Sequence, residues 1–142
     1  MARIIAIDYG LKRTGLAVTD PYQIIATGLT TIESGKLFAF LKDYFTKEEV
    51  SLIIIGEPRN LDNSDTHATG MVRRIIGQLR TEFPTIQIFT VDERFTSKMA
   101  VRSMVDAGMK KKDRRNKALV DEIAATIMLQ QYLAGSQRAP GN

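Results

Sequence analysis

Two uninterrupted apolar runs constrain the fold of this chain more than any other feature. They are residues 4–7, IIAI, and residues 52–55, LIII. A strand with one face in water alternates apolar and polar residues, whereas a strand buried on both faces is apolar throughout. We therefore expect a β-sheet that is covered by helices on both of its faces.

The spacing of apolar residues predicts the element order βββαβαβαα. The first three strands follow one another closely and should pair antiparallel, whereas the last two are separated by helices and should be parallel. Ser34 is a plausible N-cap for the first helix, and Pro84 closes the second. The expected strands are 3–8, 15–20, 24–32, 51–56 and 87–91, and the expected helices are 34–45, 72–83, about 96–107 and 117–134. This pattern predicts an α/β fold with a mixed five-stranded sheet.

Length and composition limit the classes of protein to consider. The 142 residues fit one domain over residues 1–134, with residues 135–142, GSQRAPGN, as a flexible tail. With no cysteine and one histidine, thiolate catalysis, disulfides and His-rich metal sites are excluded. No apolar stretch approaches the roughly 18 residues of a membrane helix. We expect a cytoplasmic protein with no membrane partner.

The net charge of +4 is concentrated in one short block. Six cations lie within the eight residues 110–117, and they are Lys110, Lys111, Lys112, Arg114, Arg115 and Lys117. Such a block attracts a polyanion through the release of counterions, although a solvated loop explains it about equally well. Alone, the block is weak evidence for a nucleic-acid partner.

Three carboxylates are expected to meet at one edge of the sheet. Asp8 ends the first strand and Glu93 follows the fifth, and ligands in open α/β sheets collect at the carboxyl ends of strands. Helical periodicity places Asp121 on or beside the apolar face of the last helix, near its N-terminal end, with Glu122 facing solvent. Asp8, Glu93 and Asp121 are thus candidates for one site.

Three crowded acids repel one another unless a cation joins them. Oxygen ligands without histidine or cysteine favour Mg²⁺ or Mn²⁺, and a pair of such ions can support phosphodiester hydrolysis. Gly10 would let a phosphate backbone approach without an intervening side chain. The residues alone leave an alternative open, in which Asp8 and Glu93 serve turns and Asp121 interacts with the helix dipole.

Four motifs in order resemble those of a known family. The first is Asp8-x-Gly10-x-x-Arg13-x-Gly15-x-Ala17, the second Gly56-x-Pro58, the third Asp92-Glu93-Arg94-x-Thr96-Ser97, and the fourth Asp121-x-x-Ala124-Ala125 followed by Leu129 and Tyr132. Together they resemble the pre-16S rRNA processing nucleases, also called Holliday-junction-resolvase-like or YqgF-type proteins, of the ribonuclease H-like superfamily. The resemblance spans nearly the whole chain.

The resemblance implies a ribonuclease H-like fold and a nuclease that matures the 5′ end of small-subunit rRNA, with Mg²⁺ or Mn²⁺ held by Asp8, Glu93 and Asp121. Its partner would be structured RNA, such as pre-rRNA, and the protein a monomer or homodimer. A Holliday junction resolvase acting on branched DNA and a non-catalytic RNA-binding assembly factor are alternatives. Actin-type ATPases share Asp-x-Gly after a strand, but they need two such domains and rank last.

Several neighbouring residues have open roles. Glu57 stands where many relatives have Leu. It is a fourth metal ligand, an alternative to Glu93 or, as we favour, a loop residue. Asp92 is an alternative to Glu93, because strand alternation lets only one of these neighbours face the site. Phosphate contacts are expected from Arg13, Arg94 and the block containing Lys110, Lys111, Lys112, Arg114 and Arg115. Thr96 is expected to cap a helix, and His67 to be a surface residue.

Overall fold

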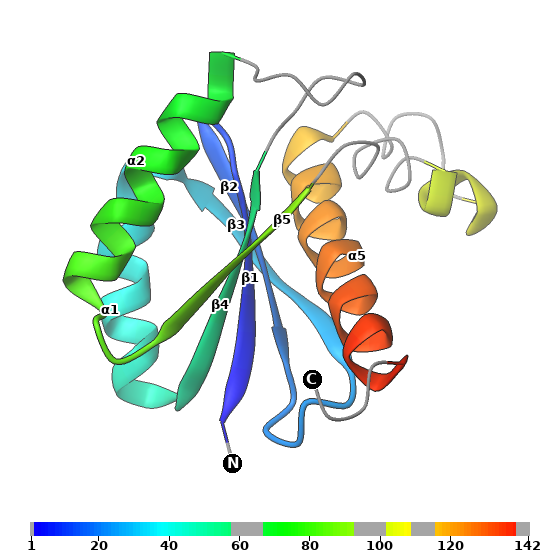
Figure 1. Cartoon of the computed structure of the whole chain (residues 1–142). Helices are drawn as coiled ribbons and strands as arrows, with labels where there is room; N and C mark the ends of the chain where they lie inside the picture. The colour runs from blue at the N-terminus through cyan, green and yellow to red at the C-terminus, as the bar shows by residue number, and fades with distance from the viewer. Residues whose placement is uncertain (1, 58–66, 93–101, 109–115, 139–142) are drawn as a thin grey trace.

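The computed structural model describes residues 2–57, 67–92, 102–108 and 116–138 (Figure 1). The strands are β1 (Arg3–Tyr9), β2 (Arg13–Thr19), β3 (Ala26–Glu33), β4 (Val50–Glu57) and β5 (Gln87–Asp92). The helices are the 3₁₀ turn η1 (Ser34–Lys36), α1 (Leu37–Lys47), α2 (His67–Glu82) and α5 (Lys117–Arg138), and residues 102–106 are also helical. Among these residues, no helix is both long and apolar enough to cross a membrane.

The five strands form one sheet in the order β3-β2-β1-β4-β5. β1 pairs antiparallel with β2, and β2 with β3, whereas β4 is parallel to both β1 and β5. The predicted mixed sheet, with three antiparallel strands followed by two parallel ones, is confirmed. Because β1, β4 and β5 run the same way, their carboxyl ends lie at one edge of the sheet.

Helices cover both faces, with α1 and α2 on one side and α5 on the other (Figure 1). The alternation of side chains along β1 divides the core accordingly. Ile5 and Ile7 belong to the buried cluster under α1 and α2, which also contains Leu37, Leu41, Val72 and Leu79. Ile4 and Ala6 belong to the cluster under α5, with Ala125, Met128 and Leu129. Both faces of β1 are therefore buried, as its apolar run predicts.

Two features at the helix ends differ from the expectation. Ser34 is not an N-cap, because it begins η1 and its hydroxyl donates to the carbonyl of Gly10 instead of a helix amide. Helix α5 ends at Arg138, beyond the expected end at residue 134. The division into a domain over 1–134 and a tail over 135–142 stays a prediction, and α5 crosses that boundary.

Helix α5 lies unusually close to the sheet because β2 and β3 each have a glycine beneath it. A Cβ atom at Gly15 would lie 2.2 Å from the carbonyl oxygen of Asp121, far inside van der Waals contact. At Gly28, a Cβ would lie 2.9 Å from Cγ of Glu122. The prediction that Glu122 faces solvent is wrong, because its half-buried side chain packs over β3. The helix leans across two strands, so its buried face is wider than a single apolar stripe.

Replacing Gly15 tests this close approach. We expect Gly15→Ala to lower the free energy of unfolding by about 3 kcal/mol or more, because the new methyl group meets backbone atoms that have no rotamer to relieve the clash. Urea unfolding followed by circular dichroism measures the change. Gly77→Ala is the matched control, since open space surrounds that position in α2 and the substitution should stabilise by up to about 1 kcal/mol. Equal effects at the two positions would contradict the packing described.

Candidate active site

Asp8 lies near the carboxyl end of β1, on the face that α5 covers. Ile4 and Ala6 face α5, so the alternation along the strand places Asp8 on the same side. Asp8 pairs in register with Gly15 of β2. The carboxylate therefore stands beside the glycine over which α5 crosses.

Asp121 comes to the same place from the other end of the chain. Its backbone contacts Gly15 directly, so Asp8 and Asp121 flank one glycine. The prediction that Asp121 points toward the sheet is supported by its ion pair with Arg13 of β2. Two of the three predicted acids thus lie at one edge of the fold.

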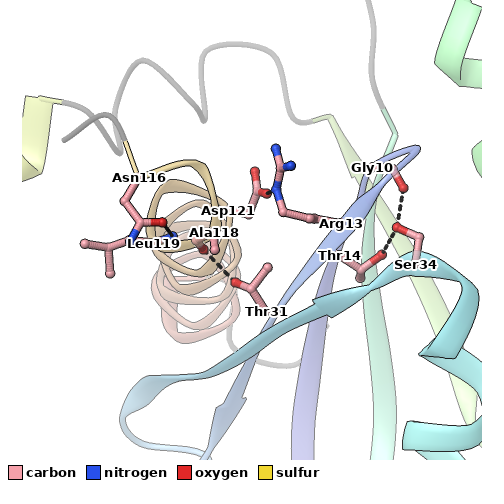
Figure 2. Close-up of polar contacts among 9 residues, drawn as sticks. All are labelled: Gly10, Arg13, Thr14, Thr31, Ser34, Asn116, Ala118, Leu119 and Asp121. Carbon is pink, nitrogen blue, oxygen red and sulfur yellow. Dashed lines mark hydrogen bonds and ion pairs between the residues drawn. The ribbon is translucent and has the colours of Figure 1, made fainter. Parts of the chain in front are cut away.

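Polar contacts fix the first turns of α5 (Figure 2). The amide of Leu119 donates to Oδ1 of Asn116 at 3.3 Å, which makes Asn116 an N-cap. The hydroxyl of Thr31 donates to the carbonyl oxygen of Ala118 at 2.6 Å and ties β3 to the helix. Both contacts set the position of Asp121 along the helix axis. Asparagine directly before a helical run is a common N-cap signal, and it could have located the start of α5 from the sequence.

Arg13 and Asp121 form an ion pair at the mouth of the site (Figure 2). Nε of Arg13 donates to Oδ2 of Asp121 at 3.3 Å, and the two side chains are 37% and 28% exposed. Burial nevertheless raises the pKa of the Asp121 carboxyl above its ordinary value, although Arg13 and Lys117 act in the opposite direction. The ionised carboxylate is therefore short of stabilising charge, a condition that a cation would relieve.

The turn between β1 and β2 is held by Ser34. Its hydroxyl lies 2.8 Å from that of Thr14 and also donates to the carbonyl of Gly10, as Figure 2 shows. A Cβ at Gly10 would lie 2.6 Å from the carbonyl oxygen of Arg13. Gly10 is thus required by the tight turn itself, a reason different from the expected approach of a phosphate. The pattern of apolar residues could not predict this role of Ser34, because its hydrogen-bond partners are distant in the sequence.

Glu57 lies on the opposite face of the sheet from Asp8. It is the last residue of β4 rather than part of a loop, and Ile53 and Ile55 on the same side of that strand pack under α1 and α2. Its Oε1 accepts from Nε of Arg73 in α2 at 3.1 Å and forms an ion pair with Nη2 of the same residue at 3.0 Å. Arg73 therefore supplies the countercharge of this acid away from Asp8 and Asp121.

The third predicted acid, Glu93, lies outside the described residues, as do Arg94, Thr96 and the basic residues Lys110, Lys111, Lys112, Arg114 and Arg115. Asp92 is the last residue of β5 and pairs with Glu57. Val91 packs in the cluster under α5, two positions before Glu93. Between β1 and β5, Gly56 of β4 presents no side chain toward α5. Within the described residues, β4 therefore contributes no side chain to the α5 face beside Asp8.

The donor set of this edge suits a hard cation. Asp8 and Asp121 offer carboxylate oxygens alone, which is the chemistry that Mg²⁺ and Mn²⁺ prefer. Within the described residues, no three acids, histidines or cysteines are grouped to hold a metal, and Glu93 lies outside them. Asp8 and Asp121 therefore fit two of the three ligand positions of the expected site.

Solved structures with the same fold define the class of protein. The Thermus thermophilus RuvC structure matches with a TM-score of 0.57 over 96% of both chains at 15% identity. T. thermophilus RuvC in complex with Holliday junction substrate gives a TM-score of 0.56 over the same shares, also at 15% identity. At this identity the likeness establishes the fold, and the chain is an α/β protein of the ribonuclease H-like class.

The sequence then gives the family. The model of the RuvX family, described as Holliday junction resolvase, matches residues 2–135, and the chain belongs to this family. A Flavobacterium psychrophilum protein named "Putative pre-16S rRNA nuclease" is 57% identical over 133 residues, covering 94% of this chain and 97% of that protein. A Flavobacterium johnsoniae protein of the same name is 51% identical over 137 residues, covering 96% and 99%. The predicted family membership is confirmed.

The raised pKa of Asp121 gives a pH-dependent prediction. The Asp121 carboxyl holds its proton more tightly in the folded protein than in the unfolded chain. The folded protein therefore loses stability as the pH rises from the ordinary pKa of 3.8 through the raised pKa. We expect Asp121→Asn to raise the melting temperature by up to a few degrees near neutral pH, and the gain to vanish below the ordinary pKa.

Thermal melts across this pH range measure the gain. Asp43→Asn, which removes an exposed carboxylate from α1, is the control and should follow the parent at every pH. A lower melting temperature for Asp121→Asn at neutral pH would show that the pair with Arg13 outweighs burial.

Proposed function

We propose that this protein is a divalent-metal-dependent nuclease that hydrolyses phosphodiester bonds in the 5′ region of pre-16S rRNA. The observation that carries the proposal is the convergence of Asp8 and Asp121 on Gly15 at the carboxyl edge of the sheet. Membership of the RuvX family and the names of the relatives support a nucleic-acid substrate. In this proposal the protein acts in the bacterial cytoplasm, where ribosomes are assembled.

Asp8 and Asp121, joined by Glu93, would hold one or two Mg²⁺ or Mn²⁺ ions. Bound there, the metal would supply an activated water and charge stabilisation for the leaving oxygen. The part of each residue follows from its position: Asp8 is fixed by the sheet, whereas Asp121 is fixed by the capped first turns of α5. Glu93 directly follows β5, the neighbour of β4 at the same edge.

Arg13 has two roles in this proposal. Its contact with Oδ2 holds the Asp121 carboxylate in place, and its guanidinium remains partly exposed at the mouth of the site. When Asp121 shares its charge with a cation, the attraction that keeps Arg13 on it weakens. The guanidinium is then available for a phosphate oxygen, for which its planar donor set is well suited. The basic residues Arg94, Lys110, Lys111, Lys112, Arg114 and Arg115 would extend the contact along the strand.

A second candidate, resolution of four-way DNA junctions, is favoured by the description of the RuvX family. Paired cuts in a junction require two active sites related by symmetry, and therefore a dimer. Sedimentation of the protein with junction DNA tests this, because a monomer on the junction would count against resolution. Cleavage assays with both polymers then separate the two nucleases.

The non-catalytic alternative makes a different prediction about metal. In the nuclease, Mn²⁺ binds only the folded protein and should raise its stability, by about 2.7 kcal/mol at a hundredfold excess over Kd. We expect Asp8→Asn to abolish this gain, to lower Mn²⁺-dependent cleavage at least about 100-fold, and to leave the fold intact. The variant should also melt at a slightly higher temperature without metal, because it relieves repulsion with Asp121.

Melting with and without Mn²⁺ and cleavage of a pre-16S fragment are the two measurements. Asp43→Asn on the far side of the sheet is the control and should behave as the parent in both. A parent protein with no metal-dependent gain in stability would favour the RNA-binding factor. Cleavage by Asp8→Asn at the parent's rate would remove Asp8 from the mechanism.

Glu57 provides a further test, because it is an acid at the same edge of the sheet but on the face opposite Asp8. We expect Glu57→Gln to keep cleavage within about twofold of the parent and to keep the stabilisation by Mn²⁺, since the guanidinium of Arg73, rather than a metal ion, pairs with this carboxylate. The same two assays apply, with Asp121→Asn as the positive control that loses both. Loss of Mn²⁺ binding in Glu57→Gln would make Glu57 a ligand.

A further inference from the structure

The tip of the turn between β1 and β2 exposes an apolar side chain beside the acids. Leu11 is 75% exposed, more than any other large apolar side chain that the structure describes. Three residues before it lies Asp8, and two residues after it lies Arg13, the partner of Asp121. Leu11 therefore lies on the turn that joins the strand of Asp8 to the strand of Arg13.

The turn that carries Leu11 is braced on both sides. Within it, the amide of Gly10 donates to the carbonyl of Arg13 at 2.9 Å. From outside, the buried Ser34 donates through its amide to the carbonyl of Lys12 at 3.0 Å and through its hydroxyl to that of Gly10. The carbonyls on both sides of Leu11 are thus anchored, and the side chain is held out into solvent by a fixed backbone.

The residue types at the tip of this turn suit contact with a nucleic acid better than exposure to water. Turn tips usually carry glycine, asparagine or aspartate, whereas this one carries a leucine that gains no burial from the fold. Lys12 beside it is also exposed, and Arg13 follows. An apolar side chain followed by two cations can contact a base with the first and phosphates with the others.

We propose that Leu11 is a wedge that stacks on the last base pair where a paired region of the substrate ends, with Lys12 on the adjoining phosphate. The inference rests on the proposed nuclease function and narrows its substrate to nucleic acid at a boundary between paired and unpaired strands. Leucine is among the side chains that proteins insert against base steps. Such a wedge would hold the terminal pair in position and direct the unpaired strand toward Asp8 and Asp121.

The test uses binding without cleavage, in protein that carries Asp8→Asn. The probe is a forked RNA duplex with 2-aminopurine in its terminal base pair, whose fluorescence reports the stacking of that base. We expect Leu11→Ala to remove most of the fluorescence change on binding and to raise Kd for the fork about fivefold, the low end of effects seen for side chains that stack on bases. Binding of the corresponding single strand should be unchanged.

Two further variants make the result specific. Ile24→Ala removes another exposed apolar side chain, 63% exposed, from the loop before β3, and should behave as the unmodified protein. Leu11→Phe keeps an apolar surface that can stack, and should retain the fluorescence change. Equal melting temperatures for the variants, expected for exposed positions, exclude a loss of fold as the cause.

The possible outcomes separate the wedge from the nuclease. If Leu11→Ala binds the fork as Ile24→Ala does, or weakens fork and single strand equally, the wedge is refuted while cleavage by the parent still supports the nuclease. If the parent with Asp8 intact neither binds nor cleaves RNA or DNA, the proposed function fails and the wedge fails with it. Selective loss on the fork, restored by Leu11→Phe, establishes the wedge.

Discussion

The contact between the backbone of α5 and Gly15 of β2 determines the arrangement of the whole functional edge. A side chain at position 15 would keep the helix from its observed position, because even a Cβ would meet the carbonyl of Asp121. Gly15 is also the register partner of Asp8. One missing side chain therefore brings together two acids from opposite ends of the chain. The cap at Asn116 and the bond from Thr31 hold the start of α5, and with it Asp121, in this position.

This arrangement makes the ionised carboxylate of Asp121 energetically unfavourable, and the proposed metal would relieve that cost. Burial makes ionised Asp121 unfavourable, and the nearby cations Arg13 and Lys117 do not fully compensate. A divalent cation would compensate two acids at once, so the protein gains more from binding metal than an exposed acid pair would. The same cost explains why the apo fold should gain stability when one of the acids becomes an amide.

Periodicity predicted those parts of the fold that depend on burial alone. The apolar runs predicted the sheet and its two covered faces, and the period of a helix placed Asp121 toward the sheet. Periodicity did not predict the roles of Ser34, Gly10 and Glu122, because each depends on a distant partner: the turn carbonyls for Ser34, the carbonyl of Arg13 for Gly10, and Gly28 for Glu122. Sequence spacing carries no information on which strand a helix crosses.

The strand-end acid Glu57 shows how a difference of one residue decides which face of the sheet an acid occupies. In register, Ile7 of β1 pairs with Ile55 of β4, so Gly56 is the neighbour of Asp8, and Glu57 points to the other face. There Arg73 neutralises it within the layer of α2. An acid at position 56 would face α5 beside Asp8, whereas glycine presents no side chain there. Among the described residues, the acids proposed to bind a cation at this edge therefore come from β1 and α5 and not from β4.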